Sequence, residues 1–124
     1  MTREQISTPD APQPAGPYSQ AIRLGNLVWT AGFGPQDPVT GAIADSVADQ
    51  TRQVLRNVEA TLVAAGLTLD DVVKTTVHLA DLADFAEFNV AYGEFFGEPR
   101  PARTTVGSVL AGIKVEIDVV AGRV

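Results

Sequence analysis

The chain has 124 residues, a formal net charge of −6, 45% hydrophobic residues and no cysteine. This length fits one domain, and the hydrophobic fraction is sufficient for a packed core. The acidic balance and the nine scattered Lys and Arg residues disfavour a nucleic-acid partner, because such binding rests on neutralising phosphates. The lack of cysteine excludes a disulfide, a thiolate nucleophile and a zinc–thiolate site.

We expect a single domain over residues 1–124, with residues 1–15 forming a flexible or extended N-terminal segment. This first segment has no apolar signal core and contains prolines, which stop helices. No apolar run approaches the roughly 20 residues of a membrane span. The sequence therefore predicts a soluble cytoplasmic protein without a membrane partner.

Two short strands are expected first, at about residues 19–24 and 27–32, because Gly-Asn between β-type runs is typical of a hairpin. A helix is predicted to begin near Ser46, with Asp49 completing an imperfect capping box and Gly66 following its end. The apolar face of this helix consists of Val47, Val54, Leu55, Val58 and Leu62.

The stretch DDVVKTTVHLA, residues 70–80, alternates as a strand does. The apolar side of this strand is predicted to carry Val73, Thr75, Val77 and Leu79. Residues 84–96 then predict a second amphipathic helix, opened by the capping pattern Asp84-x-x-Glu87. Its aromatic face consists of Phe85, Phe88, Tyr92, Phe95 and Phe96.

Two more strands are expected near residues 103–109 and 113–123. In the second, one face carries Ile113, Val115, Ile117 and Val119, and the other carries Lys114, Glu116, Asp118 and Val120. The element order β-β-α-β-α-β-β predicts an α+β fold in which two helices cover one face of a mixed sheet. The uncovered face is expected to meet another copy of the chain.

Arg103 and Glu116 stand where the pattern predicts burial. Arg103 is either an ordinary surface charge or a guanidinium group that holds a carboxylate by two parallel hydrogen bonds. Glu116 is compatible with a solvated strand residue paired to Lys114 or Arg123. If its face packs against a neighbouring subunit, Glu116 instead becomes a partly desolvated carboxylate that can orient a water or transfer a proton.

Three further residues each allow two interpretations. Tyr18 is either core filler or an exposed phenol that lines a pocket, and Asn89 binds either a backbone loop or a ligand. His78, the only histidine, is a structural or surface residue or else a general base. No metal site is predicted, because a lone histidine would need several convergent carboxylates and no short cluster offers them.

A set of motifs together resembles the RidA (YjgF) family of reactive-intermediate deaminases, from about Ile6 to Val124. These motifs are GPYSQA, the Gly-Asn turn, DPVTG, QTRQVLRNVEATLVAAG, DDVVKTTVHLADLADFAEFN and PARTTV…VEI. The resemblance implies a chorismate-mutase-like fold, assembled as a homotrimer with active sites in the clefts between subunits. It also implies hydrolysis of 2-imino acids, such as 2-iminobutanoate and 2-iminopropanoate, to 2-oxo acids and ammonia without metal or cofactor.

Carried over by motif, the resemblance implies that Arg103 clamps the substrate carboxylate and Glu116 positions the attacking water. Tyr18 lines the pocket and Asn89 is its neighbour. The resemblance also implies that the residues around Gly32, Phe33 and Thr105 complete the substrate-binding pocket.

This chain reads Ala31-Gly32-Phe33 where family members often read Ser-Gly-Gln, and Thr105 where many have cysteine. The polarity near the imine therefore differs from that of the family. A relative acting on another enamine or amide, such as an aminoacrylate or aminomuconate, remains an alternative. A third alternative is a small-molecule-binding or chaperone-like trimer without catalysis.

Overall fold

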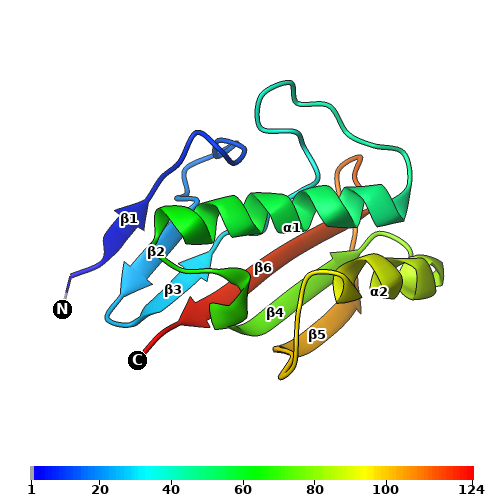
Figure 1. Cartoon of the computed structure of the whole chain (residues 1–124). Coiled ribbons are helices and arrows are strands. Elements are labelled where there is room, and N and C mark those ends of the chain that lie inside the picture. Colours follow the sequence, from blue (N-terminus) through cyan, green and yellow to red (C-terminus); the bar gives the residue numbers. More distant parts are fainter. Residues whose placement is uncertain (1) are drawn as a thin grey trace.

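The computed structural model describes residues 2–124. The strands form one mixed sheet in the order β1-β2-β3-β6-β4-β5 (Figure 1). Neighbouring strands are antiparallel except β4 and β5, which are parallel. The strand bounds are β1 (Glu4–Ile6), β2 (Ala21–Leu24), β3 (Leu27–Thr30), β4 (Val72–Leu79), β5 (Ala102–Gly107) and β6 (Val115–Gly122).

Two α-helices, α1 (Val47–Ala64) and α2 (Phe85–Gly93), lie on the same face of this sheet (Figure 1). Short 3₁₀ helices, η1 (Leu69–Asp71) and η2 (Leu82–Asp84), precede β4 and α2. The predicted α+β fold, with both helices on one face of a mixed sheet, is confirmed. Within residues 2–124, none of the helices combines the length and the apolar character that crossing a bilayer requires.

Helix α1 follows its sequence pattern closely. The Ser46 side chain accepts a hydrogen bond from the Asp49 backbone N–H, which satisfies one of the free donors of the first turn. Gly66 ends the helix with a φ of 79°, in the left-handed region that glycine adopts without strain. The predicted apolar face is confirmed, since Val47, Val54, Leu55, Val58 and Leu62 are all buried.

Helix α2 begins after Asp84, as predicted, but it is shorter than predicted and lacks the expected capping bond. The helix ends at Gly93, and Asp84 makes no side-chain capping bond, so the predicted capping pattern is wrong. Phe88 is fully buried, whereas Phe85, expected on the same face, is 42% exposed. Phe85 lies in the first turn, at the end of the helix, and is therefore only partly covered by the sheet.

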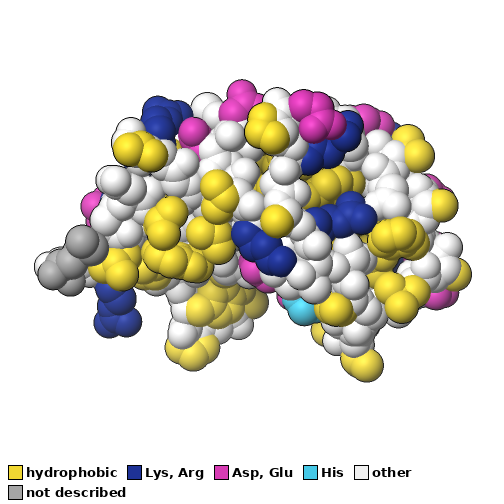
Figure 2. All heavy atoms as spheres, turned by 90° about the horizontal axis from the view of Figure 1, so that it is seen from below, with side chains coloured by type: hydrophobic (Ala, Val, Ile, Leu, Met, Phe, Trp, Pro, Cys, Tyr) yellow, Lys and Arg dark blue, Asp and Glu magenta, His cyan; other side chains and the backbone are white. Residues whose placement is uncertain are grey.

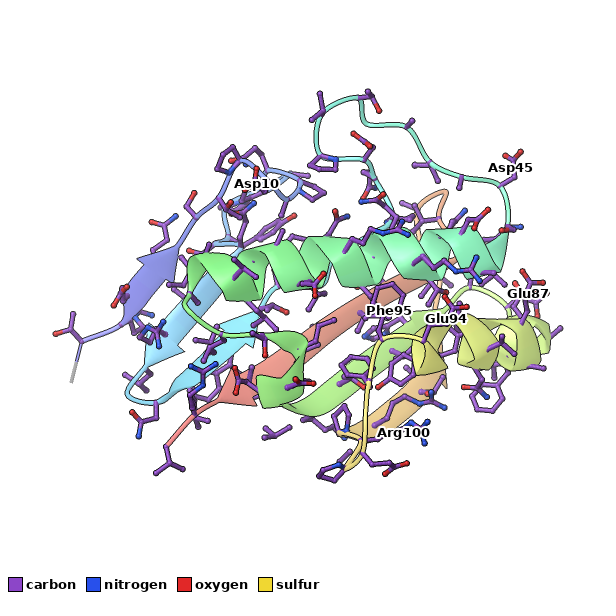
Figure 3. All side chains as sticks on the ribbon, viewed as in Figure 1. Asp10, Asp45, Glu87, Glu94, Phe95 and Arg100 are labelled. Carbon is purple, nitrogen blue, oxygen red and sulfur yellow. The ribbon has the colours of Figure 1, made fainter. Side chains whose placement is uncertain are left out.

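The acidic side chains of α2 and its C-terminal cap hold it against α1. The Glu87 carboxylate accepts a hydrogen bond from the Ala48 backbone N–H, at 3.1 Å. Arg52 of α1 donates to both oxygens of Glu94, each at 2.9 Å. Both glutamates are labelled in Figure 3, where they lie on the side of α2 that faces α1. These contacts fix α2 over β4 and β5.

Strand β1 was not assigned from the sequence. Residues 4–6 pair antiparallel with β2, with Ile6 opposite Ala21. Ile6 is buried, whereas its two strand neighbours are exposed. A run of three residues is too short to show an alternating pattern, so only its partner strand defines it.

The pairing of β4 with β6 contains an irregularity between Val72 and Lys74. Val72 is buried, and Val73 is 53% exposed. The prediction that Val73 shares a face with Thr75 is therefore wrong, because a bulge inserts one unpaired residue and shifts the alternation. From Thr75 onward the predicted alternation of β4 is confirmed.

Strand β6 lies in the interior of the sheet and begins at Val115, two residues later than predicted. Its buried residues, Val115, Ile117, Val119 and Ala121, face the helices. Glu116, Asp118 and Val120 lie on the opposite face, which we call the open face.

The open face carries several exposed apolar side chains. Trp29, Leu24, Leu27 and Val106 are each between 37% and 40% exposed. The pairing of β2 with β3 places the first three on one face, because Ile22 is opposite Trp29 and Leu24 is opposite Leu27. On the side seen in Figure 2, where the histidine (cyan) reaches the surface, hydrophobic side chains gather in several groups.

Candidate functional site

Glu116 lies on the open face, and a glycine gives its side chain room. A Cβ atom on Gly32 would lie 2.8 Å from Glu116 Oε2 and 2.9 Å from its carboxyl carbon. Real Cβ atoms essentially never approach another heavy atom this closely, so the carboxylate occupies space that any other residue at position 32 would fill. The sequence-predicted Glu116 and Gly32 are therefore in direct contact.

Tyr18 lies beside these two residues. Its hydroxyl accepts a hydrogen bond from the Ala15 backbone N–H at 3.1 Å, and its side chain is 51% exposed. Two cavities meet here, one of about 650 Å³ and one of about 260 Å³. Tyr18, Gly32 and Glu116 line both of them. The carboxylate thus stands at the junction of two hollows, with a phenol nearby.

Arg103 lies in β5, at the edge of the sheet, with its guanidinium under α2. The carbon atom of the guanidinium lies 4.8 Å from the centre of the Tyr92 ring and 5.5 Å from those of Phe85 and Phe88. Such stacking orients a guanidinium while leaving its N–H donors free. Within residues 2–124, Arg103 forms no ion pair with a carboxylate. It is therefore a fixed cation without an anion.

The Tyr92 ring under this guanidinium is itself held in place. Its hydroxyl and the Thr75 hydroxyl share a hydrogen bond of 2.8 Å. Burial raises the pKa of the Tyr92 phenol, and the bond to Thr75 and the Arg103 charge oppose that rise. Tyr92 is consequently a neutral platform for Arg103 at physiological pH.

Asn89 and Arg103 line one cavity of about 350 Å³. Arg100, labelled in Figure 3 on the loop before β5, also lines it. Among the described residues, Asn89 Oδ1 and Thr105 Oγ1 are the buried side-chain oxygens without a hydrogen-bond partner. Buried polar atoms are nearly always paired, so two unpaired oxygens near a free guanidinium indicate a place for a ligand or water.

The sheet separates these two groups of residues within one chain. Thr75 of β4 is buried toward the helices and is paired with Arg103, so Arg103 lies on the helix face. His78 lies on the open face and is paired with Glu116. The structure therefore brings Glu116, Gly32 and Tyr18 together, and separately Arg103 and Asn89, with Thr105 on the same face. One chain does not join the two groups.

Phe33 is only 5% exposed, and its backbone pairs with Ile117 in both directions, at 2.9 and 3.1 Å. Its ring belongs to the hydrophobic core, although it also borders the smaller cavity. Phe33 therefore reaches the smaller cavity as part of its lining, through a ring that otherwise belongs to the core.

His78 does not contact the Arg103 group. Its Nδ1 lies 2.7 Å from Ser108 Oγ, on the open face. Burial raises the pKa of the Asp118 carboxyl on this face, and the charge of His78 opposes that rise. Among residues 2–124, no group of three or more His, Cys, Asp or Glu side chains is placed to hold a metal ion.

Two residues that shape the site were missed by the sequence analysis. Gln20, within the motif GPYSQA, is 2% exposed, and its amide nitrogen donates to the backbone oxygens of Thr8, Ala11 and Pro12. Asn57 of α1 donates to the backbone oxygens of Gly34 and Gln36. A polar residue on the apolar face of a predicted helix was the available signal for Asn57.

Residues 8–122 match the family described as "Endoribonuclease L-PSP". The chain belongs to the RidA (YjgF) family. A RutC family protein of Pyrococcus horikoshii is 49% identical over 96% of this chain and 97% of its own length. A protein of Salmonella typhimurium named 2-iminobutanoate/2-iminopropanoate deaminase is 46% identical over 95% of this chain and 96% of its own.

The RidA-type fold is also found among solved structures. The structure of E. coli TdcF with bound serine superimposes with a TM-score of 0.93 at 42% identity, covering 98% of this chain and 99% of that one. Identity of this level over nearly the whole length supports the same element order and sheet topology in this RidA family member.

Proposed function

We propose that this RidA family member hydrolyses reactive 2-imino acids to 2-oxo acids and ammonia, in clefts between the subunits of a homotrimer. The observation that carries the proposal is the division of the site. An unpaired guanidinium lies on one face of the sheet, and an accessible carboxylate lies on the other. Two chains packed together can supply Arg103 from one subunit and Glu116 from the next, so that each site is completed by its neighbour.

In this mechanism Arg103 clamps the substrate carboxylate. Its planar fork matches a carboxylate through two charge-assisted hydrogen bonds, and its stacking on Tyr92 and Phe88 fixes the orientation. Asn89 Oδ1 and Thr105 Oγ1 are available to bind the substrate or a bridging water. The clamp holds the imine carbon at a defined place in the cleft, which accounts for a large part of the rate acceleration.

Glu116 positions and activates the water that attacks the imine carbon. The carboxylate accepts a proton as the water oxygen bonds to the imine carbon, and it returns that proton to the nitrogen. This gives a carbinolamine, whose hydroxyl proton then passes through the same carboxylate to the nitrogen. The C–N bond breaks, ammonia leaves and the C=O bond of the 2-oxo acid forms. Tyr18 borders this place and can hydrogen-bond the leaving nitrogen or the water. General-base assistance of this kind contributes about a hundred- to ten-thousandfold to rates.

Ala31 and Phe33 favour one alternative within the same chemistry. Both replace residues that are polar in many family members, so another enamine or amide could be the substrate of the same clamp and water. The deaminase name of the Salmonella relative supports imino acids as the first class to test. A cytoplasmic location and the absence of a cofactor remain predictions.

Coupled turnover tests the proposed function. A serine or threonine dehydratase generates the imino acid, and 2-oxo acid formation is followed with and without this protein. We expect clear acceleration by the wild type and a loss of about a hundredfold or more in Glu116→Gln, which keeps shape but cannot accept the proton. If the wild type binds a 2-oxo acid but never accelerates imine loss, the protein is a binding protein and not an enzyme.

A further inference from the structure

We propose that the smaller cavity beside Glu116 is the subsite for the substrate side chain, and that it selects 2-imino acids whose longer side chain ends in a hydrogen-bonding group such as an amide. Gln36 is the residue whose side-chain amide hydrogen-bonds to this group. This inference rests on the function proposed above and specifies its substrate class.

The size of the cavity exceeds what the smallest imino acids need. Its volume is about 260 Å³, several times the roughly 30 Å³ that one water molecule occupies in the liquid. A methyl or ethyl side chain would leave most of it unfilled. An amide-bearing side chain of glutamine length fills it better.

The position of the cavity gives the orientation of the substrate. The larger cavity includes Ile22 and Trp29 of the open sheet face, which is the face proposed to meet the neighbouring subunit that supplies the guanidinium. The smaller cavity adjoins the larger one at Tyr18, Gly32 and Glu116 and is lined by loops of this chain. A substrate held by its carboxylate in the larger cavity therefore points its side chain into the smaller one.

The lining of the smaller cavity is apolar apart from a few groups. Pro12, Ala15 and Ile113 form apolar walls. The amide nitrogens of Gln13 and Gln20 are occupied, since both donate to backbone oxygens of residues 8–12.

The Gln36 amide is different, because within residues 2–124 it makes no side-chain hydrogen bond and lines the cavity. It offers both a donor and an acceptor, which is the complement of another amide.

The backbone around Gln36 is held by α1, and Gly34 leaves room for the Gln36 side chain. Asn57 donates to the backbone oxygens of Gly34 and Gln36, at 3.0 and 2.9 Å, and so ties the loop to α1. The amide lies over Gly34, where an added Cβ would come within 2.6 Å of Gln36 Oε1. Alanine at position 34 would therefore displace the flexible end of Gln36 without needing backbone movement.

Competition assays with imino acids of different side chains test the inference. An L-amino-acid oxidase with catalase generates the imines of glutamine, leucine and alanine, and semicarbazide traps the imine that this protein has not hydrolysed. We expect the wild type to prefer the glutamine-derived imine over the leucine-derived one, which has similar bulk. Gln36→Leu and Gly34→Ala should both lower that preference by about two- to tenfold, the range of one neutral hydrogen bond. Gly97→Ala, at a glycine with open space around it, should not change it.

The outcomes separate this inference from the proposed function. Hydrolysis of the alanine-derived imine with rejection of both larger ones would overturn the subsite and leave the function standing. An equal loss for all three imines in Gln36→Leu would make Gln36 a structural residue and would also overturn the inference. If the wild type accelerates none of the three, the function falls and the subsite falls with it.

Discussion

At the scale of single residues, this protein depends on close approach more than on unusual chemistry. Gly32 has no side chain because the Glu116 carboxylate occupies that space. Within residues 2–124 Arg103 has no acidic partner, and three aromatic rings orient it instead. Each residue is ordinary by type, and its neighbours give it a defined position. Substitutions that change size or geometry while keeping charge are therefore informative.

Gly32→Ala should reduce imine hydrolysis strongly while the protein still folds. The new methyl group would collide with the carboxylate and rotate Glu116 away, which removes most of the general-base contribution of about a hundredfold or more. Steady-state kinetics and a thermal melt measure the two effects. Gly97→Ala serves as the matched control, since a Cβ there meets nothing within 4 Å. Full activity in Gly32→Ala would show that the observed Glu116 position is unimportant.

Arg103→Lys should lose most activity without loss of fold. A point charge replaces a bidentate fork, at a cost of about 1.5–3 kcal/mol per charge-assisted hydrogen bond lost. This corresponds to roughly ten- to a hundredfold in kcat/KM. The same kinetic assay, together with binding of a 2-oxo acid, measures it. Turnover near that of the wild type in the lysine variant would rule out the guanidinium as the clamp.

At the scale of elements, helix α1 does more than cover the sheet. Asn57 is 1% exposed, and its amide holds the loop that contains Gly34 and Gln36. Gln20 does the same for the loop of residues 8–12. These two buried amides replace backbone pairing that the loops cannot make among themselves. They connect the core to the walls of the smaller cavity.

Asn57→Ala should destabilise the protein and loosen this wall. Two buried carbonyl oxygens lose their donors, and each unsatisfied group costs about 1–3 kcal/mol. Urea unfolding should show a lower free energy of unfolding, and KM should rise more than kcat falls. Substitution of the exposed Arg56 on the same helix is the control, with an effect expected within about 0.5 kcal/mol. Wild-type stability in Asn57→Ala would mean that water replaces the amide.

At the scale of the whole molecule, the open face of the sheet carries apolar side chains that the two helices do not cover. Both helices lie on the other face, and Trp29, Leu24 and Leu27 remain partly exposed. Large apolar patches on a protein surface commonly mark an interface. The division of Arg103 and Glu116 between the two faces gives the interface a functional reason, because each site would need a neighbour.

The protein is predicted to be a trimer in solution. Burial of the open face against other copies is the physical reason, and a closed symmetric assembly avoids open-ended growth. Sedimentation equilibrium measures the mass directly, and three times 13.0 kDa is expected. A mass of one chain at micromolar concentration would contradict both the trimer and the shared site.

The open face should also make stability depend on pH through Asp118. Burial raises the pKa of this carboxyl above its ordinary 3.8, with His78 opposing the rise. Between the ordinary and the raised pKa the folded state binds the proton more strongly, so stability falls as pH rises through that window. Asp118→Asn should therefore stabilise the protein at neutral pH, and the gain should shrink as the pH approaches 3.8. Thermal melts across pH measure it, and a destabilised asparagine variant at neutral pH would contradict it.

The sequence alone determined the features that depend on local spacing. Helix α1, its caps and its buried face follow from a 3.6-residue period and from Ser46 and Gly66, which act within a few positions of themselves. The placement of Glu116 opposite Ile117 follows from the two-residue period of a strand. The motifs were sufficient to indicate the family, because they record combinations of residues spread over the whole chain.

The tertiary structure decided everything that depends on pairing between distant segments. The bulge at Val73, the strand at Glu4–Ile6 and the exposure of Phe85 are each set by a partner element and not by the local pattern. The division of the site has the same origin. Arg103 faces the helices because β5 pairs with β4 in a register that puts it beside Thr75, and a shift of one residue would have placed it on the face of Glu116. Register is fixed by long-range packing, so no local pattern in PARTTV reveals it.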